Sequence, residues 1–346
     1  MNENNVNLKK SIIQNIKNFK IYLNERFPLG KNSFFVLIFT LSGYIYTSLL
    51  YNSKIMNQFF SKGIKIPFFR YETIALFIII LMFFLQLRIT DEFKDYEEDL
   101  KYRAYRPVQR GIISLNALKK IGIATIIIQI ILAYTINHKI IYCIVLVWLY
   151  MFLMAKEFFI KKWLTKRILT YALSHVVIMI FITLVIVNAT QYIVLNEAGN
   201  LFTLEVLQWH RHNIYIALIP LFALNYLNGI VLEIGRKTRK ADEEENGVQT
   251  YSKLWGRKKA VTVLNLLYIS EYFFVILGLS NISHKYFWLG ASILLLILLS
   301  SMYFMIKFLK KDLSGKIVET ISGLWIIFSG MCMGFLPYLI FLLFSI

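Results

Sequence analysis

Charged residues and cysteines are both scarce in this chain. Asp, Glu, Lys and Arg make up 17% of its 346 residues, against about 25% in a typical soluble domain. The two cysteines, Cys143 and Cys332, each lie within an apolar stretch, so the sequence predicts neither a disulfide framework nor a zinc cluster. The hydrophobic share is 58% and the mean hydropathy is +0.59. This composition excludes the disordered, collagen-like and disulfide-scaffold classes and indicates a membrane protein with several spans.

Long apolar stretches predict nine transmembrane helices, because a spanning helix needs about 20 mostly apolar residues. We therefore expect an all-α, polytopic membrane protein. Residues 1–33 are polar and Lys-rich and show no signal-peptide pattern. They are expected to be a cytoplasmic segment, either an interfacial helix or a partly ordered tail, preceding a membrane domain over residues 34–346. The predicted spans cover residues 34–52, 72–90, 118–137, 139–155, 168–190, 213–233, 260–280, 286–306 and 320–345.

Lys and Arg outnumber Asp and Glu by 38 to 20, and they are unevenly distributed among the loops. The loops after spans two, four, six and eight are rich in Lys and Arg, and the alternate loops are poorer, except the first, which carries Lys54, Lys62, Lys65 and Arg70. This bias predicts a cytoplasmic N-terminus and an external C-terminus. It also favours anionic membrane lipid, and not nucleic acid, as the partner of the basic residues. The Lys-, Ile- and Asn-rich composition and the lack of a targeting segment favour a bacterial inner membrane.

An acidic run follows span two. Asp91, Asp95 and Asp99 are spaced by four residues, and Glu92 lies three residues before Asp95. On a helix these carboxylates would share one face, where like charges repel, so a positive partner is expected. Oxygen ligands suit Mg²⁺, which proteins usually share between one or two carboxylates and substrate phosphates. We predict that Asp91, Glu92, Asp95 and Asp99 are catalytic metal ligands; the alternative is a solvated acidic helix end.

The acidic run and the loop after it carry a resemblance to a known family. Arg106, Pro107, Arg110 and Gly111 follow the run, and Pro and Gly there indicate a loop. The whole stretch resembles the first motif of the UbiA superfamily of intramembrane prenyltransferases, N-D-x-x-D-x-x-x-D followed by R-P-x-x-x-G. The family's leading Asn is Asp91 here and its first Asp is Glu92, and both changes keep an oxygen ligand.

Two further stretches are similar to family patterns. Residues 26–30 resemble the R-x-x-P-x-G pattern before the first helix, and residues 150–156 resemble a Y-x-x-x-K-R region, with Glu157 where that pattern has a second base. The resemblance covers essentially the whole chain. It implies a nine-helix bundle with a lipid-open central cavity, Mg²⁺ as cofactor, an isoprenyl diphosphate as substrate and an aromatic or lipid acceptor.

The second motif of the family, D-x-x-x-D near the end of span six, is altered. The tail from residue 247 to residue 256 fits, and counting back from it places the two aspartates on Arg239 and Glu243. Asp242 is adjacent and Glu233 lies earlier, so acidic oxygens are present but displaced. The resemblance implies that Glu233, Asp242 and Glu243 hold metal, or that cations assist diphosphate binding; an ordinary basic-then-acidic loop is the third reading.

Basic and polar residues near the two motifs are candidate substrate ligands, because a diphosphate leaving group needs cations aimed at it. Asn225 and Asn228 in span six could bind acceptor or diphosphate, or form helix–helix hydrogen bonds. His175 and Glu271 are the other intramembrane polar points, with a satisfied core histidine as the ordinary reading of the first. The candidate diphosphate ligands are Arg106, Lys156, Arg236 and Lys237.

Several functions fit these residues. The first is a Mg²⁺-dependent prenyltransferase, and the second is a membrane terpene cyclase of the same family that needs no acceptor. A transporter is more remote, because its charges would lie near the bilayer midplane on broken helices, whereas the carboxylates here cluster at the predicted cytoplasmic ends. A CDP-alcohol phosphotransferase is the least favoured, since its D-G-x-x-A-R core is absent from the sequence.

Overall fold

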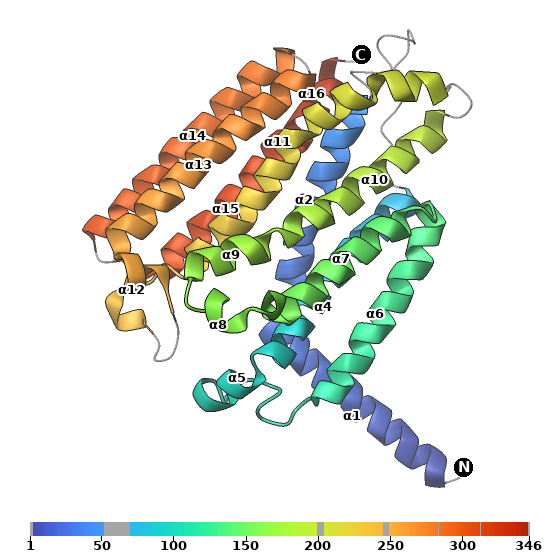
Figure 1. Cartoon of the computed structure of the whole chain (residues 1–346), viewed down its shortest axis with the longest axis vertical. Coiled ribbons are helices and arrows are strands. Elements are labelled where there is room, and N and C mark those ends of the chain that lie inside the picture. The colour runs from blue at the N-terminus through green and yellow to red at the C-terminus, as the bar shows by residue number, and fades with distance from the viewer. Residues whose placement is uncertain are drawn as a thin grey trace.

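The computed structural model of the protein describes residues 3–51, 70–198, 204–244, 249–282, 284–311 and 313–344, and within these ranges every regular element is helical. Lipid offers the backbone no hydrogen-bond partner, so an apolar segment that crosses it must satisfy its own N–H and C=O groups, as a helix does. The elements are α1 (Glu3–Arg26), α2 (Leu29–Tyr51), α4 (Tyr71–Lys94), α5 (Tyr96–Tyr102), α6 (Leu115–Ile136), α7 (Ile140–Ala155), η2 (Glu157–Phe159), α8 (Lys161–Leu164), α9 (Ile168–Val176), α10 (Ile178–Ala198), α11 (Leu204–Arg236), η4 (Ala241–Glu243), α12 (Tyr251–Trp255), α13 (Arg257–Ile282), α14 (His284–Lys310), α15 (Lys316–Met333) and α16 (Phe335–Phe344) (Figure 1).

Eight helical segments in the described ranges are long and apolar enough to cross a membrane. They are α2, α4, α6, α9 with α10, α11, α13, α14, and α15 with α16, and they coincide with eight of the nine predicted spans. The remaining prediction corresponds to α7, which has 16 residues. At 1.5 Å per residue α7 is about 24 Å long, shorter than the roughly 30 Å hydrocarbon core. The all-helical polytopic prediction is confirmed, with one span shorter than expected.

The bundle is built around α2. Of its apolar window 72% is buried, against 22% for α6, and α2 packs against α4, α10 and α15. The α13–α14 pair lies on one flank of the bundle and α6 on the other (Figure 1). A polar contact supports the centre, because Tyr46 of α2 donates a hydrogen bond to the Ala217 carbonyl of α11 at 2.7 Å. The low burial of α6 means that most of its apolar side chains lie on the outside of the bundle, where they would face lipid.

A glycine, Gly334, lies at the junction of α15 and α16. A Cβ on Gly334 would lie 2.7 Å from both the Cα and the carbonyl oxygen of Ser42 on α2. Only glycine permits this approach of two backbones. Gly334 thus lets the α15–α16 junction pack directly on the central helix α2.

The short elements α5, α8 and α12 lie at one end of the bundle with α1, and the C-terminal helix α16 reaches toward the other end (Figure 1). α1 docks through Tyr22, which is buried against Ile89 of α4 and against Val108 and Ile113 of the loop after α5. The predicted N-terminal segment is thus helical, and the first span begins at Leu29 instead of residue 34. The loops that carry both predicted motifs share this end. The predicted loop residues Lys54, Lys62 and Lys65 lie outside the described residues.

Candidate active site

The acidic run does not form one continuous helix. α4 ends at Lys94 and α5 begins at Tyr96, with Asp95 between them at φ −98° and ψ 8°. The backbone still turns helically, because the Asp95 N–H donates to the Asp91 carbonyl at 2.9 Å and the Asp99 N–H donates to the Asp95 carbonyl at 2.8 Å. The helical spacing of the three aspartates is therefore kept across the junction of α4 and α5.

Two of the four predicted ligands are already neutralised by arginines. Glu92 is fully buried and accepts a hydrogen bond from Arg26 of α1 at 2.6 Å. Asp99 is fully buried and pairs with Arg103 at 2.7 Å and with Arg106. Buried carboxylates need such partners, and breaking one of these pairs is costly. In this arrangement Glu92 anchors α1 on α4, and Asp99 folds the loop that follows α5.

The other two carboxylates, Asp91 and Asp95, are poorly neutralised. Asp91 is partly exposed and has a long ion pair of 3.5 Å with Arg88, and the Asp95 side chain has no hydrogen bond or ion pair within the described chain. Burial, with the negative charges of Asp91, Asp99 and Glu98, raises the pKa of Asp95 to about 6, against the opposing charge of Lys94. A carboxylate pair at this spacing with uncompensated charge fits a divalent cation.

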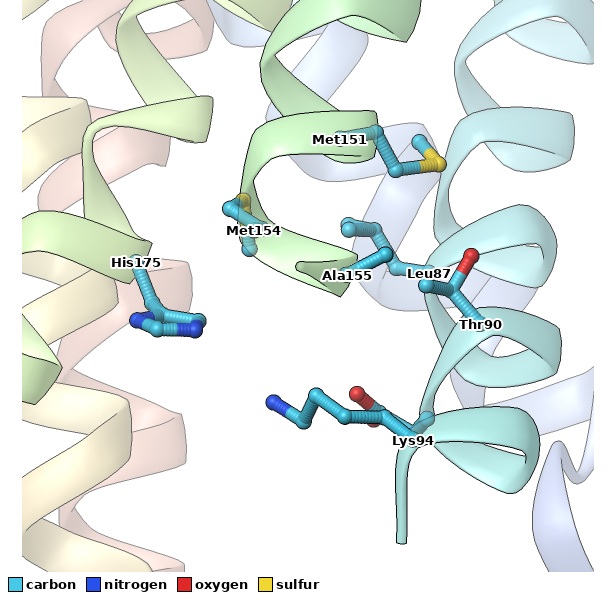
Figure 2. A pocket seen from close by; sticks show the side chains of 8 residues that line it. Leu87, Thr90, Lys94, Met151, Met154, Ala155 and His175 are labelled. Atoms are coloured by element: carbon cyan, nitrogen blue, oxygen red, sulfur yellow. The ribbon is translucent and has the colours of Figure 1, made fainter. Parts of the chain in front are cut away.

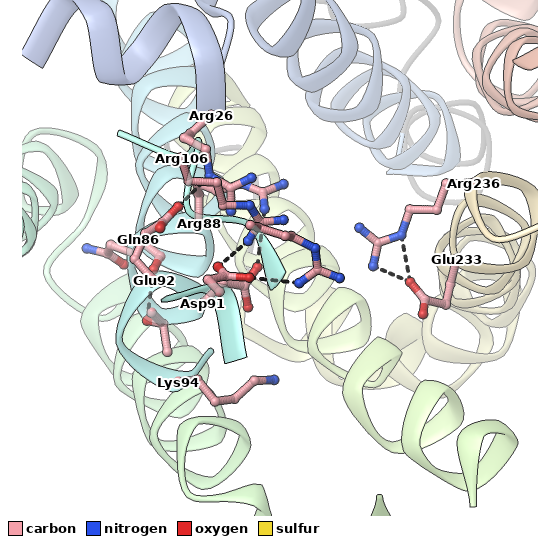
Figure 3. A network of polar contacts seen from close by, with 12 residues as sticks. Arg26, Gln86, Arg88, Asp91, Glu92, Lys94, Arg106, Glu233 and Arg236 are labelled. Carbon is pink, nitrogen blue, oxygen red and sulfur yellow. Dashed lines mark hydrogen bonds and ion pairs between the residues drawn. The ribbon is translucent and has the colours of Figure 1, made fainter. Parts of the chain in front are cut away.

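Arginines from four parts of the chain surround Asp91 (Figure 3). Arg26, Arg88 and Arg106 gather on one side of it, and Arg236 faces it from α11. The charge of Arg236 acts on both Asp91 and Arg88, and the Nε atoms of Arg88 and Arg106 are buried without a hydrogen bond in the described structure. Such donors suit phosphate oxygens. Arg88 was not a predicted ligand, although an arginine one turn before Asp91 in a membrane span is itself a signal of function.

The second motif places basic side chains at the site, and its acidic residue Glu233 is paired with two of them. Glu233 is buried at the end of α11. One of its oxygens accepts from Arg236 Nε at 2.8 Å, and the other pairs with Lys237 Nζ at 2.6 Å. Both oxygens are engaged, and the three side chains together keep one positive charge. This group faces the Asp91 side of the site as a basic surface (Figure 3).

The other predicted ligands of the second motif are occupied elsewhere. Glu243 accepts hydrogen bonds from the Gly315 N–H at 2.7 Å, the Lys240 N–H at 3.2 Å and the Ser314 hydroxyl. Partial burial opposes these bonds, but they lower the pKa of Glu243. Asp242 is exposed and pairs with Lys240 at 3.2 Å. In the described part of the chain no three acidic, His or Cys side chains converge to hold a metal ion, so Glu243 ties two loops together in this arrangement.

The remaining predicted ligands also have other surroundings. Lys156 caps α7 and is exposed. Asn225 is buried and donates to Thr183 Oγ1 at 3.0 Å, and Asn228 accepts from Ser329 Oγ at 3.5 Å. These two contacts join neighbouring helices, which is the alternative role stated for both asparagines.

A polar cluster that the sequence did not predict lies beside Asp91. Glu157 is buried and forms ion pairs with Lys94 at 3.4 Å and with His175 Nε2 at 3.3 Å. Tyr171 accepts a hydrogen bond from Lys94 at 2.5 Å and donates one to Glu157 at 3.2 Å. Burial alone would raise the pKa of Glu157, but the His175 hydrogen bond and the Lys94 charge outweigh it and lower that pKa.

A pocket joins this cluster to the first motif (Figure 2). Its polar lining is Thr90, Asp91 and Lys94 of α4 with His175 of α9. The apolar lining consists of Leu87, Met151, Met154 and Ala155. The pocket therefore offers an apolar wall directly beside the poorly neutralised carboxylate.

The backbone that presents Glu157 is strained. Glu157, Phe158 and Phe159 have φ values of 48°, 53° and 60°, a left-handed turn without glycine. Left-handed conformations cost L-residues about 1–2 kcal/mol each. Strain of this kind persists only where the surrounding contacts over-determine it, and it clusters at functional sites.

Known proteins share this sequence pattern and fold. Residues 59–314 match the model of the UbiA prenyltransferase family. A structure described as giving structural and mechanistic insights into the biosynthesis of digeranylgeranylglyceryl phosphate synthase in membranes is 18% identical, with a TM-score of 0.55 over 93% of this chain and 99% of that chain.

Two UbiA homologues have the same fold. The apo form from Aeropyrum pernix K1 is 16% identical, with a TM-score of 0.53 over 85% of this chain and 96% of that chain. The homologue from Archaeoglobus fulgidus bound to DMAPP and Mg²⁺ is 11% identical, with a TM-score of 0.52 over 90% of this chain and 98% of that chain. No functionally curated protein matches the chain. At these identities the likeness to the solved structures shows the fold.

Proposed function

This chain belongs to the UbiA prenyltransferase family, and on that premise we propose that it is a Mg²⁺-dependent intramembrane prenyltransferase. It would ionise an isoprenyl diphosphate and transfer the prenyl group to an aromatic or lipid acceptor. The observation that carries the proposal is the convergence of Arg88 and Arg236 on Asp91 at one end of an apolar helical bundle. The structural neighbour that is bound to DMAPP and Mg²⁺ supports it.

Asp91 and Asp95 are the residues proposed to hold the metal. They carry charge that the described residues leave largely uncompensated, whereas Glu92 and Asp99 are paired with arginines. When bound there, Mg²⁺ supplies charge neutralisation for the departing diphosphate. In this proposal Glu92 and Asp99 support the loop.

The second motif supplies cations in place of a second set of carboxylates. Glu233 shares its two oxygens between Arg236 and Lys237, so it has no free oxygen for a metal in this arrangement. The spare positive charge faces Asp91. We assign Arg236 and Lys237 to the diphosphate oxygens, with Arg88 on the opposite side.

The residues of this chain would act at the reacting bond as follows. The bond between C1 of the prenyl chain and the diphosphate oxygen breaks, and its electron pair leaves with the diphosphate, which Arg88 and Arg236 stabilise. The acceptor atom then bonds to C1 and loses its proton. Water would quench the allylic cation, and the apolar side chains of Met151 and Met154 beside Asp91 help to exclude it.

The shared end of the two motifs supports one orientation of the chain in the membrane. The basic loops and α1 lie at the end that carries the site, and α16 reaches the opposite end. With the positive-inside bias, we assign the site and residues 1–33 to the cytoplasmic side and the C-terminus to the outside. The bacterial inner membrane is the proposed location.

A direct assay tests the function. Protein in nanodiscs is incubated with geranyl, farnesyl or geranylgeranyl diphosphate, with Mg²⁺ or EDTA, and released diphosphate and organic products are identified by mass spectrometry. Mg²⁺-dependent release that requires an added lipid extract or aromatic acid is expected, and Asp95→Asn should abolish it while Glu97→Gln, an exposed control, should not. A cyclic hydrocarbon formed without acceptor would replace the transferase by a cyclase. No release from any diphosphate would contradict the proposal.

A further inference from the structure

Lys94 is placed where it could disable the proposed metal site. It lies between Asp91 and Asp95 in the sequence, and its charge acts on both. Lys and Asp three residues apart on a helix readily pair. A lysine paired with Asp91 or Asp95 would supply the positive charge that a divalent cation otherwise brings. The site therefore needs a means of keeping this ammonium group away.

The structure directs Lys94 to another partner. Its ion pair in the described chain is with Glu157 at 3.4 Å, and its ammonium donates to Tyr171 at 2.5 Å. The ammonium also lies over the Tyr171 ring, 5.1 Å from the centroid. Figure 2 shows the Lys94 side chain extending from α4 toward His175 on α9. Among the described residues, the Asp91 side chain keeps a single ion pair, the long contact with Arg88 at 3.5 Å.

Glu157 is itself held rigidly. The left-handed turn of residues 157–159 points it inward, and it is 4% exposed. His175 secures its second oxygen, while His175 Nδ1 bonds the Tyr171 carbonyl at 2.8 Å and its ring stacks on that of Tyr171 at 3.9 Å. A carbonyl only accepts, so Nδ1 of His175 donates this hydrogen bond, and Nε2 faces Glu157. Glu157 thus lies between Lys94 and the ring of His175.

We propose that Glu157 is a positioning residue that sequesters Lys94, so that Asp91 and Asp95 stay available to a divalent cation. The inference rests on the proposed function, because it assigns the metal to those two carboxylates. It explains why three residues without glycine adopt a left-handed turn next to α7.

The test measures metal binding without turnover. Protein in nanodiscs is titrated with Mn²⁺, free Mn²⁺ is followed by its electron paramagnetic resonance signal, and no substrate is present. Glu157→Gln keeps the size of the side chain and removes the charge that holds Lys94. Loss of a group that supports metal ligands typically weakens binding about 10- to 100-fold, and we expect a loss in that range. The double variant Lys94→Met with Glu157→Gln should restore wild-type affinity, because no lysine remains to compete.

The controls separate this inference from a folding defect and from the proposed function. Glu97→Gln removes one exposed carboxylate near the same motif and should leave Mn²⁺ affinity within about threefold of wild type. Rescue by the double variant shows that the fold is intact, since it still lacks Glu157. If Glu157→Gln binds Mn²⁺ as tightly as the wild type, the inference is overturned and the metal assignment stands. The same holds if adding Lys94→Met to Glu157→Gln fails to restore binding. Absence of Mn²⁺ binding by the wild type would overturn the metal assignment, and this inference with it.

Discussion

Replacing Glu233 by Gln separates the two readings of the second motif, because they predict changes of opposite sign. In the structure both Glu233 oxygens are bound, one by Arg236 and the other by Lys237. Glu233→Gln therefore raises the net charge of this trio from one to two. If the trio clamps diphosphate, the anion should bind more tightly. If Glu233 were a metal ligand, the metal-assisted binding of diphosphate should weaken.

The size of the effect follows from Coulomb's law. One unit charge acting on another across about 8 Å at an effective dielectric constant of about 20 contributes roughly 2 kcal/mol, and solvent around the exposed Arg236 reduces this. A gain of about 1–2 kcal/mol corresponds to roughly 5- to 30-fold tighter binding. Arg236→Gln should act in the other direction, because losing a charge-assisted hydrogen bond costs about 1.5–3 kcal/mol.

The assay is calorimetric binding of inorganic diphosphate and of an unreactive prenyl thiolodiphosphate, in nanodiscs with saturating Mg²⁺. Arg239→Gln is the matched control for Arg236→Gln, because it removes the same charge from the loop that carries Glu243. Arg236→Lys should lose part of the affinity, since it keeps the charge but not the planar fork. A Glu233→Gln variant that binds diphosphate tenfold more weakly than wild type would refute the clamp and return Glu233 to the metal ligands.

Three further changes have defined outcomes. The pKa of Asp95 is raised to about 6 from 3.8, so without metal, in EDTA, the folded protein holds this proton more tightly than the unfolded chain and its stability falls as pH rises from about 4 to 6. This loss of stability is about 3 kcal/mol at most, and about 1–2 kcal/mol after solvent screening. Asp95→Asn should abolish it in thermal melts recorded against pH. Glu243→Gln should lower the melting temperature by a few degrees at neutral pH and have little effect in acid, because the lowered pKa of Glu243 makes its bonds stabilising only while it is ionised; an equal loss at every pH would contradict this. Gly334→Ala should destabilise the protein by about 1–3 kcal/mol through the clash with the Ser42 backbone, and an unchanged melting curve would show that the helices can separate there.

The position of the site within the bundle has a consequence for substrate access. Asp91 and the pocket beside it lie near the C-terminal end of α4. In the proposed function, the diphosphate would therefore stay near water while the prenyl chain would lie in the apolar interior. The arginines come from α1, α4, α11 and the loop after α5. Docking of α1 is therefore part of the site. Arg26 joins this helix to Glu92 at 2.6 Å.

Local sequence features were enough to predict the membrane spans, the acidic run and the turn after it. Hydropathy over about 20 residues depends only on neighbours in the chain, and so does the four-residue spacing of Asp91, Asp95 and Asp99. The turn at Gly111, with φ +73°, follows from local chemistry in the same way. These features also carried the resemblance to the family that the chain belongs to.

The tertiary structure alone decided which carboxylates are free. Arg26 neutralises Glu92 from a helix 66 residues away, and Glu157 meets Lys94 and His175 from separate elements, so no local pattern could reveal either pairing. The asparagines of α11 were assigned to packing by their partners on α10 and α15 for the same reason. A carboxylate's charge can be read from sequence, but whether that charge remains available to a ligand depends on which cations the fold brings to it.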